Sequence, residues 1–260
     1  MLSSYSHRKF RAMAACLRPR FQRVRSATMA VGEKLMTWTW LGPPLKVVED
    51  PSDHIYKDFY GLSGIPFSIT PDPEFLFLAD THQCVIEKLH YGIRSRMGFM
   101  LLTGEVGTGK TTLCRTLLDH FQGRARTVYV INPSLSGQEL LACILEDLEI
   151  PCPVQASKKE LLDRLNRFLL ARTSAEPVVI IIDDAQSMPP ATLEDLRLLS
   201  NLETDKTKLL QMLLVGQPEL LVQLDRPELR QLKQRVVIHC CLDYLTRAEV
   251  AGYIERRLFV

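Results

Sequence analysis

The sequence predicts an α/β domain in which helices cover both faces of a five-stranded parallel sheet. Short apolar segments alternate with segments whose apolar residues recur at helical spacing, from about residue 98 to the end of the chain. The strand-like segments are apolar along their whole length, as in VVIII at 178–182, which is typical of parallel strands buried on both faces. Strands and helices that alternate in this way indicate a doubly wound domain.

The predicted elements follow one another in a regular order. The first is a helix over 81–96, because Val85, Leu89 and Ile93 recur at helical spacing. Three later helices open with a Ser or Thr followed three residues on by Glu, the spacing of a capping box, at 136, 157 and 246. The predicted strands lie within 98–104, 126–132, 177–186, 208–216 and 236–240. The other predicted helices lie within 110–121, 136–148, 157–173, 192–202, 217–235 (with a proline break) and 246–258.

The predicted organisation has three parts. Residues 1–55 form a basic tail and linker, 56–243 the α/β core, and 244–260 the first helix of a helical lid, of which only this start is present. Residues 1–32 carry seven basic side chains and no acid, and the remaining 25 basic and 30 acidic residues give the rest of the chain a net charge of about −5. We interpret the basic segment as a disordered leader. A basic arm for nucleic acid, a contact with anionic membranes and a transit peptide are the alternatives.

The composition argues against several classes of protein. No window approaches the roughly 18–20 consecutive apolar residues of a membrane span. The seven cysteines are scattered and form no C-x-x-C pair, so the sequence predicts neither a zinc site nor a disulfide framework. We therefore expect a protein of the reducing cytoplasm.

The stretch LLTGEVGTGKTTL at 101–113 predicts a phosphate-binding loop. It matches G-x-x-x-x-G-K-[ST] and lies between a predicted strand and a predicted helix, as this loop requires. Glycines let backbone N–H groups point at phosphate oxygens, and the following helix N-terminus favours negative charge. Lys110 is predicted to contact the β- and γ-phosphates, and the Thr111 hydroxyl to bind Mg²⁺. The predicted nucleotide-binding residues are Gly104, Glu105, Val106, Gly107, Thr108, Gly109, Lys110, Thr111 and Thr112.

Four further positions complete the predicted site. Asp183 and Asp184 follow an apolar strand, at the sheet edge where the phosphate loop is also expected. Asp183 is predicted to hold Mg²⁺, and Asp184 to polarise the attacking water. Gln217 follows the next strand and is predicted to contact the γ-phosphate or that water, with a helix cap as the alternative. Arg235 precedes the last strand and is predicted to act as an arginine finger on a neighbouring subunit, with a solvated surface position as the alternative.

With these motifs the chain resembles AAA+ ATPases, which are P-loop NTPases. More specifically it resembles the general secretion pathway protein A family, the ExeA-like ATPases of type II secretion. The resemblance runs from about residue 56 to residue 258. It is carried by TGEVGTGKTT, LSNLETDK and LVGQPEL, together with FYGLSGIPFSITPDPEFLFLADTH. Closely similar ATPases accompany exosortase and polysaccharide-export systems, and transposition helper ATPases are more distant relatives.

The resemblance implies a site for ATP and Mg²⁺. It assigns Asp183 to the family's metal-binding acid, Gln217 to its sensor position and Arg235 to its finger. Asp184 departs from the family, which usually has Glu there. Its side chain is one methylene shorter, so the carboxylate is expected about 1 Å or more from the water-polarising position, and such an offset lowers a rate by ~10²-fold. ATP binding is expected to survive the change.

The sequence therefore predicts an ATPase that hydrolyses ATP to ADP and phosphate. It is expected to act as a homo-oligomer in the cytoplasm and to drive the assembly or remodelling of a secretion or envelope-export partner. One alternative is an ATP-gated binding switch with little hydrolysis, which Asp184 and the short lid favour. Another is a DNA-engaging ATPase like the transposition helpers. The basic tail favours that alternative, but the acidic body does not, and no DNA-reading motif is visible.

Overall fold

A computed structural model describes residues 59, 61, 67, 77–131, 133–153, 155–171, 176–200, 202 and 207–258. These residues all belong to one compact unit, Glu49–Val260. The predicted basic tail and linker, 1–55, lie outside the described residues.

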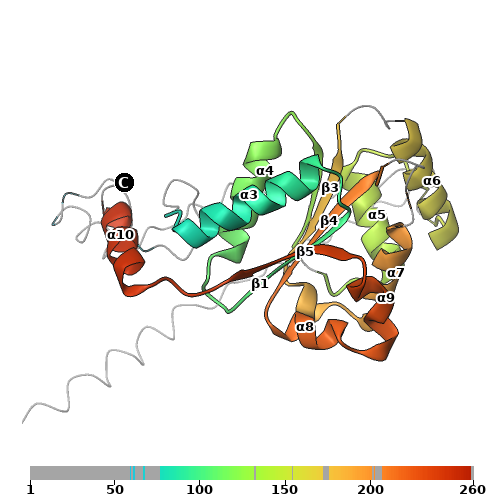
Figure 1. Cartoon of the computed structure of the whole chain (residues 1–260). Helices are drawn as coiled ribbons and strands as arrows, with labels where there is room; N and C mark the ends of the chain where they lie inside the picture. The colour runs from blue at the N-terminus through green and yellow to red at the C-terminus, as the bar shows by residue number, and fades with distance from the viewer. Residues whose placement is uncertain are drawn as a thin grey trace, which may run out of the picture. The chain divides into compact units, whose positions relative to one another are not determined.

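The core of the fold is a five-stranded sheet in which every pair of neighbouring strands is parallel, so the predicted sheet is confirmed. The strand order is β2-β3-β4-β1-β5, which places β4 between β1 and β3 (Figure 1). Phe99 of β1 pairs with Met212 of β4, and Ile182 of β3 pairs with Leu214 of the same strand. The strands are β1 Phe99–Gly104, β2 Arg126–Val130, β3 Val178–Ile182, β4 Leu210–Gly216 and β5 Val236–Leu242.

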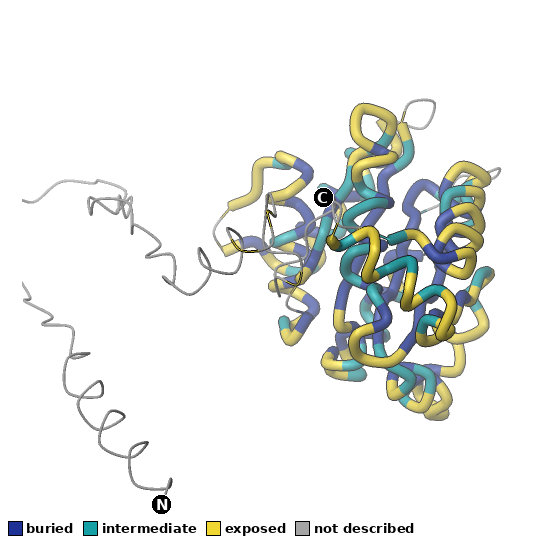
Figure 2. Tube along the Cα trace, turned by 90° about the vertical axis from the view of Figure 1, so that its left-hand side faces the viewer, coloured by how far each residue is buried: buried dark blue, intermediate teal, exposed yellow. Residues whose placement is uncertain are grey.

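Helices cover both faces of this sheet and bury two separate apolar clusters against it. On one face, Leu89 and Leu117 pack with strand residues such as Leu102. On the other face, Ile144 and Leu196 pack with strand residues such as Ile180. Figure 2 shows the buried strands enclosed by helices whose outer sides are exposed. The first face carries α3 Asp80–Arg94 and α4 Lys110–Phe121. The second carries α5 Gly137–Asp147, α6 Lys158–Ala171, α7 Pro190–Leu199, α8 Glu219–Leu224 and α9 Arg230–Lys233.

Local sequence signals explain where several helices begin. In all three predicted capping boxes, the Glu carboxylate accepts from the backbone N–H of the capping residue, at 2.8 Å for Ser136, 2.8 Å for Ser157 and 2.7 Å for Thr246. The helical segment predicted over 217–235 breaks before Pro227, which starts the short 3₁₀ turn Pro227–Leu229 between α8 and α9. A proline that lacks its N–H and fixes φ is tolerated in a first turn but not in a helix interior.

The last described helix, α10 Arg247–Leu258, follows an extended segment after β5 and stands away from the sheet (Figure 1). None of its residues is fully buried. Its described packing includes an edge-to-face contact of Tyr253 with Phe77, whose ring centroids lie 6.5 Å apart. Among the described residues, no helix combines the length and apolar character that crossing a bilayer requires.

The parallel arrangement decides where a site can form. Because all five strands run in the same direction, their carboxyl ends meet at one edge of the sheet. The loop after β1, the acids after β3 and the turn after β4 all lie at this edge. The segment that leads into β5 lies at the opposite edge.

Candidate functional site

The segment between β1 and α4 has the backbone of a phosphate-binding loop. A Cβ at Gly104 would lie 2.6 Å from the Leu242 carbonyl oxygen, so only glycine fits where the loop leaves the sheet. Gly107 and Gly109 have φ values of 85° and 88°, in the left-handed region that favours glycine. No side chain caps the first turn of α4. A helix start left open in this way is suited to binding an anion.

Lys110 lies within this loop. The residue is 8% exposed, and its ammonium group donates to the carbonyl oxygens of Gly104 and Glu105, at 2.8 Å each. The positive charge is therefore held across the loop, where the sequence predicts the β- and γ-phosphates. Val106, at the tip, is 67% exposed and makes no part of the core.

Thr111 and Asp183 are brought together from separate parts of the chain. The Thr111 hydroxyl donates to Asp183 Oδ2 at 2.8 Å. Asp183 is 4% exposed, and its backbone N–H continues the sheet by donating to the Val130 carbonyl oxygen at 2.9 Å. Hydroxyl and carboxylate oxygens are ligands that Mg²⁺ accepts, so this donor set fits the metal that accompanies a nucleotide.

Tyr129 is a residue of this site that sequence reasoning missed. Its hydroxyl donates to the same oxygen, Asp183 Oδ2, at 2.8 Å. Burial, and then the hydrogen bond to Asp183, raise the pKa of Tyr129 well above its usual value, so the phenol stays protonated and keeps donating. A tyrosine between two buried valines of a strand, Val128 and Val130, was the available signal, because a partly buried hydroxyl needs a partner.

Asp184 turns the chain away from β3. Its φ of 52° is one of three positive values among the described residues other than glycine. Its N–H donates to Asp183 Oδ1 at 3.0 Å, and its carboxylate accepts from the Gln186 side chain at 3.2 Å. The carboxylate is exposed at the same edge as the phosphate loop. Gln186 was not predicted, and no sequence motif marks it.

Gln217 lies at the end of β4, between the loop after β1 and the acids after β3. Its backbone N–H donates to Gln186 Oε1 at 3.1 Å, so Gln186 links Gln217 to Asp184. A contact of the Gln217 side chain with phosphate or water stays a prediction.

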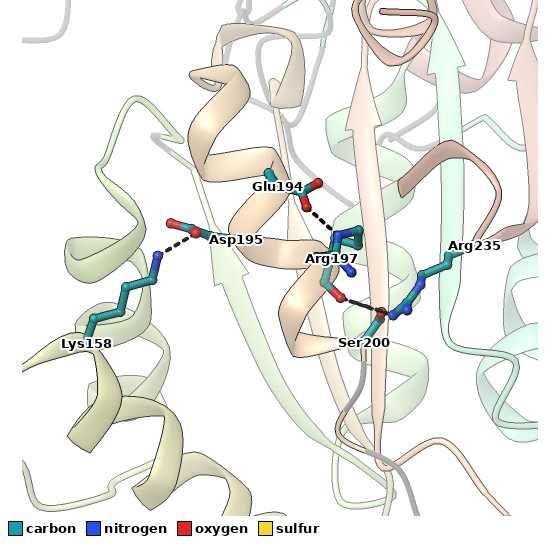
Figure 3. A network of polar contacts seen from close by, with 6 residues as sticks. All are labelled: Lys158, Glu194, Asp195, Arg197, Ser200 and Arg235. Carbon is teal, nitrogen blue, oxygen red and sulfur yellow. Dashed lines mark hydrogen bonds and ion pairs between the residues drawn. The ribbon is translucent and has the colours of Figure 1, made fainter. Parts of the chain in front are cut away.

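Arg235 lies at the opposite edge of the sheet, directly before β5. Its guanidinium group donates to the Arg197 carbonyl oxygen at 3.2 Å and to the Ser200 hydroxyl, both at the end of α7 (Figure 3). Arg235 is therefore not brought to the phosphate loop of its own chain. Its predicted role on a neighbouring subunit stays a prediction.

His82 is another residue that sequence reasoning missed. It lies in the first turn of α3, and its Nε2 is 3.0 Å from the Thr108 carbonyl oxygen of the phosphate loop. The helical spacing that identified Val85, Leu89 and Ile93 as core residues also includes position 82, so a histidine on that stripe was the available signal.

The comparisons with known proteins identify the family. A family profile described as an AAA domain matches residues 93–224. The chain therefore belongs to the AAA domain family, the class of protein that this parallel sheet and phosphate loop define. Over 207 residues it is 44% identical to general secretion pathway protein A of Aeromonas hydrophila, an alignment that covers 79% of this chain and 38% of that protein. The expected resemblance to that protein's family is confirmed, over well under half of the relative's length.

Two solved structures support the fold. Cdc6p of Pyrobaculum aerophilum aligns with a TM-score of 0.59 and 20% identity, over 73% of this chain and 54% of that chain. The ORC2 protein of Aeropyrum pernix aligns with a TM-score of 0.56 and 17% identity, over 74% of this chain and 54% of that chain. At these identities the likeness shows the fold alone, and the predicted P-loop fold of the AAA+ type is confirmed.

Proposed function

We propose that this chain is a Mg²⁺-dependent ATPase that hydrolyses ATP to ADP and phosphate and works as a homo-oligomer. The observation that carries the proposal is the 2.8 Å contact of Thr111 with Asp183 beside the phosphate loop. Lys110, held within that loop, adds the positive charge that phosphate binding needs. The glycine cradle, the lysine and the paired oxygen ligands together fit a nucleotide with its metal.

Each residue has a distinct role in the proposed reaction. Lys110 and the N–H groups of the loop bind and orient the phosphates. Thr111 and Asp183 hold Mg²⁺, which when bound neutralises charge on the phosphate oxygens. Asp184 orients the attacking water for in-line displacement, and Gln217 contacts the γ-phosphate or that water. Because Arg235 lies at the far edge of its own sheet, it is proposed to stabilise the developing charge in a neighbouring copy.

The proposed cellular role rests on the relative. General secretion pathway protein A is named for a secretion pathway, and 44% identity over 207 residues supports a related role for the domain. We place the chain in the cytoplasm, where ATP is available, acting on a protein of a secretion or envelope-export system. Its hydrolysis would drive assembly or remodelling of that partner.

A second candidate is an ATP-gated binding switch. Asp184 is shorter than the Glu usual in the family, and its carboxylate is engaged by Gln186 at 3.2 Å. Both features favour slow hydrolysis with ATP binding retained. In this version the binding of ATP, and not its hydrolysis, controls the interaction with the partner.

One experiment separates these functions. ATP turnover per subunit is measured as the concentration of the full chain rises, with Lys110→Ala as the blank. Turnover that climbs with concentration is expected, because Arg235 must come from another copy. ATP binding without turnover at any concentration would favour the switch, and Asp184→Glu should then raise the rate. A wild-type chain that binds no ATP would overturn both versions.

A further inference from the structure

A buried histidine of α3 contacts the phosphate loop. His82 is 5% exposed, and its Nε2 lies 3.0 Å from the Thr108 carbonyl oxygen. A carbonyl oxygen can only accept a hydrogen bond, so this geometry assigns the proton to Nε2. The ring also packs against the next residue, because a Cβ at Gly109 would lie 3.2 Å from the same nitrogen. His82 therefore supports the Thr108–Gly109 peptide on the side that faces α3.

This contact fixes the orientation of one peptide group. The described residues contain no cis peptide bond, and in a trans peptide the carbonyl and the following N–H point in opposite directions. Holding the Thr108 carbonyl toward His82 therefore turns the Gly109 N–H away from α3. Within the described part of the chain, that N–H donates no hydrogen bond. It stays available for a ligand oxygen.

The second ring nitrogen argues against a purely structural role. His82 Nδ1 is buried and has no hydrogen-bond partner among the described residues. Leaving a buried polar atom unpaired is unfavourable, so an apolar side chain would fill this part of the α3 stripe better. The position is nevertheless occupied by a histidine, whose Nε2–H reaches the phosphate loop.

We infer that His82 is a positioning residue for nucleotide binding, which it controls by orienting the Gly109 N–H toward the β-phosphate. The inference rests on the proposed ATP site and adds a contact from outside the loop motif. Displacement of α3 would therefore reach the phosphate loop through this side chain.

The test compares two variants of similar shape. His82→Gln keeps an amide N–H that can donate to Thr108, while His82→Met has nearly the same length and no donor. The affinity of the full chain for ADP with Mg²⁺ is measured by calorimetry. We expect His82→Gln to bind within about twofold of wild type and His82→Met about five- to tenfold more weakly, the size of one lost neutral hydrogen bond. His90→Met, the same change on the same helix at a stacking contact with Phe121, should leave the affinity unchanged.

The outcomes separate the role of His82 from the existence of the ATP site. Equal ADP affinity of the Gln and Met variants would overturn the inference while leaving the proposed ATP site intact. A thermal scan without nucleotide checks folding, and His82→Phe is a second variant without a donor. If both non-donor variants are unfolded while His82→Gln is folded, the residue is structural and the inference fails. If the wild-type chain binds no ADP, the proposed function falls, and the inference falls with it.

Discussion

The hydroxyl of Tyr129 donates to Asp183 Oδ2 at 2.8 Å, the same carboxylate oxygen that accepts from Thr111. Tyr129 comes from β2 and Thr111 from the first turn of α4, so two neighbouring elements hold one carboxylate in place. A carboxylate held by a partner of this kind is pre-oriented for a metal ion, because such partners fix the direction of its lone pairs.

Removing this hydroxyl should weaken metal binding. For Tyr129→Phe we expect about tenfold more Mg²⁺ to be needed for half-maximal ATP binding. This is the lower end of the loss in metal affinity that follows when a hydrogen-bond partner of a metal ligand is removed. Titrating Mg²⁺ at fixed ATP measures this. Tyr91→Phe, at an exposed position on α3, is the control. An unchanged Mg²⁺ requirement in Tyr129→Phe would show that the Tyr129 hydroxyl does not orient Asp183 for the metal.

Replacing the loop lysine should weaken nucleotide binding itself. Lys110→Ala removes a charged group that is held within the loop. A hydrogen bond to a charged group contributes about 1.5–3 kcal/mol, so the dissociation constant for ATP should rise roughly 10- to 100-fold. Calorimetric titration tests this, with Lys159→Ala on the exposed side of α6 as a matched control. If Lys110→Ala bound ATP with wild-type affinity, Lys110 would not contribute to nucleotide binding.

Mixing two inactive variants should restore activity. Arg235→Ala should lower turnover by about 10³-fold or more if the arginine acts as a finger, and Lys110→Ala should be inactive through its own loop. In mixed assemblies, the intact loop of one chain meets the intact arginine of the other. Turnover of the mixture is therefore expected to exceed that of either variant alone. A mixture as inactive as its components would contradict a role of Arg235 between copies.

The capping box of α5 should make stability depend on pH in a defined range. The hydroxyl of Ser136, followed by its backbone N–H, lowers the pKa of Glu139 below its ordinary 4.5. A group whose folded pKa is depressed stabilises the protein above its unfolded pKa, and the contribution is lost as pH falls through the folded value. The difference in urea midpoint between wild type and Glu139→Ala should therefore be present at pH 7 and shrink below about pH 4.5. A difference that is the same at pH 7 and pH 3 would contradict this account.

Much of the fold could be predicted because its signals are local. Apolar runs, helical spacing and capping boxes each lie within a few residues, and α4 was predicted with the bounds that it has. The strand order could not be predicted in the same way. Which strands pair depends on how α3 and α4 share one face of the sheet while α5 to α9 fill the other, and no short segment carries that information.

The residues of the candidate site also fall into two groups, those that a short motif predicts and those that only the folded structure brings together. The loop from Gly104 to Thr112 and the acid Asp183 belong to short motifs, so the sequence was enough to find them. Tyr129 meets Asp183 across 54 residues of chain, and His82 meets Thr108 across 26. Contacts of this kind exist only once the sheet and helices have been assembled, so residue type alone did not reveal them. The position of Arg235 against α7 was equally invisible in the sequence.

The place of β4 has a consequence for how the protein is made. β4 follows both β1 and β3 in the chain, yet it is the strand that separates them in the sheet. The native placement of Thr111 beside Asp183 therefore depends on Leu210–Gly216, which pairs with both strands. Pairing across such long stretches of sequence is slow. A nascent chain thus lacks the complete sheet edge while its first three strands emerge from the ribosome, and under the proposed function ATP would stabilise only molecules that have finished building the sheet.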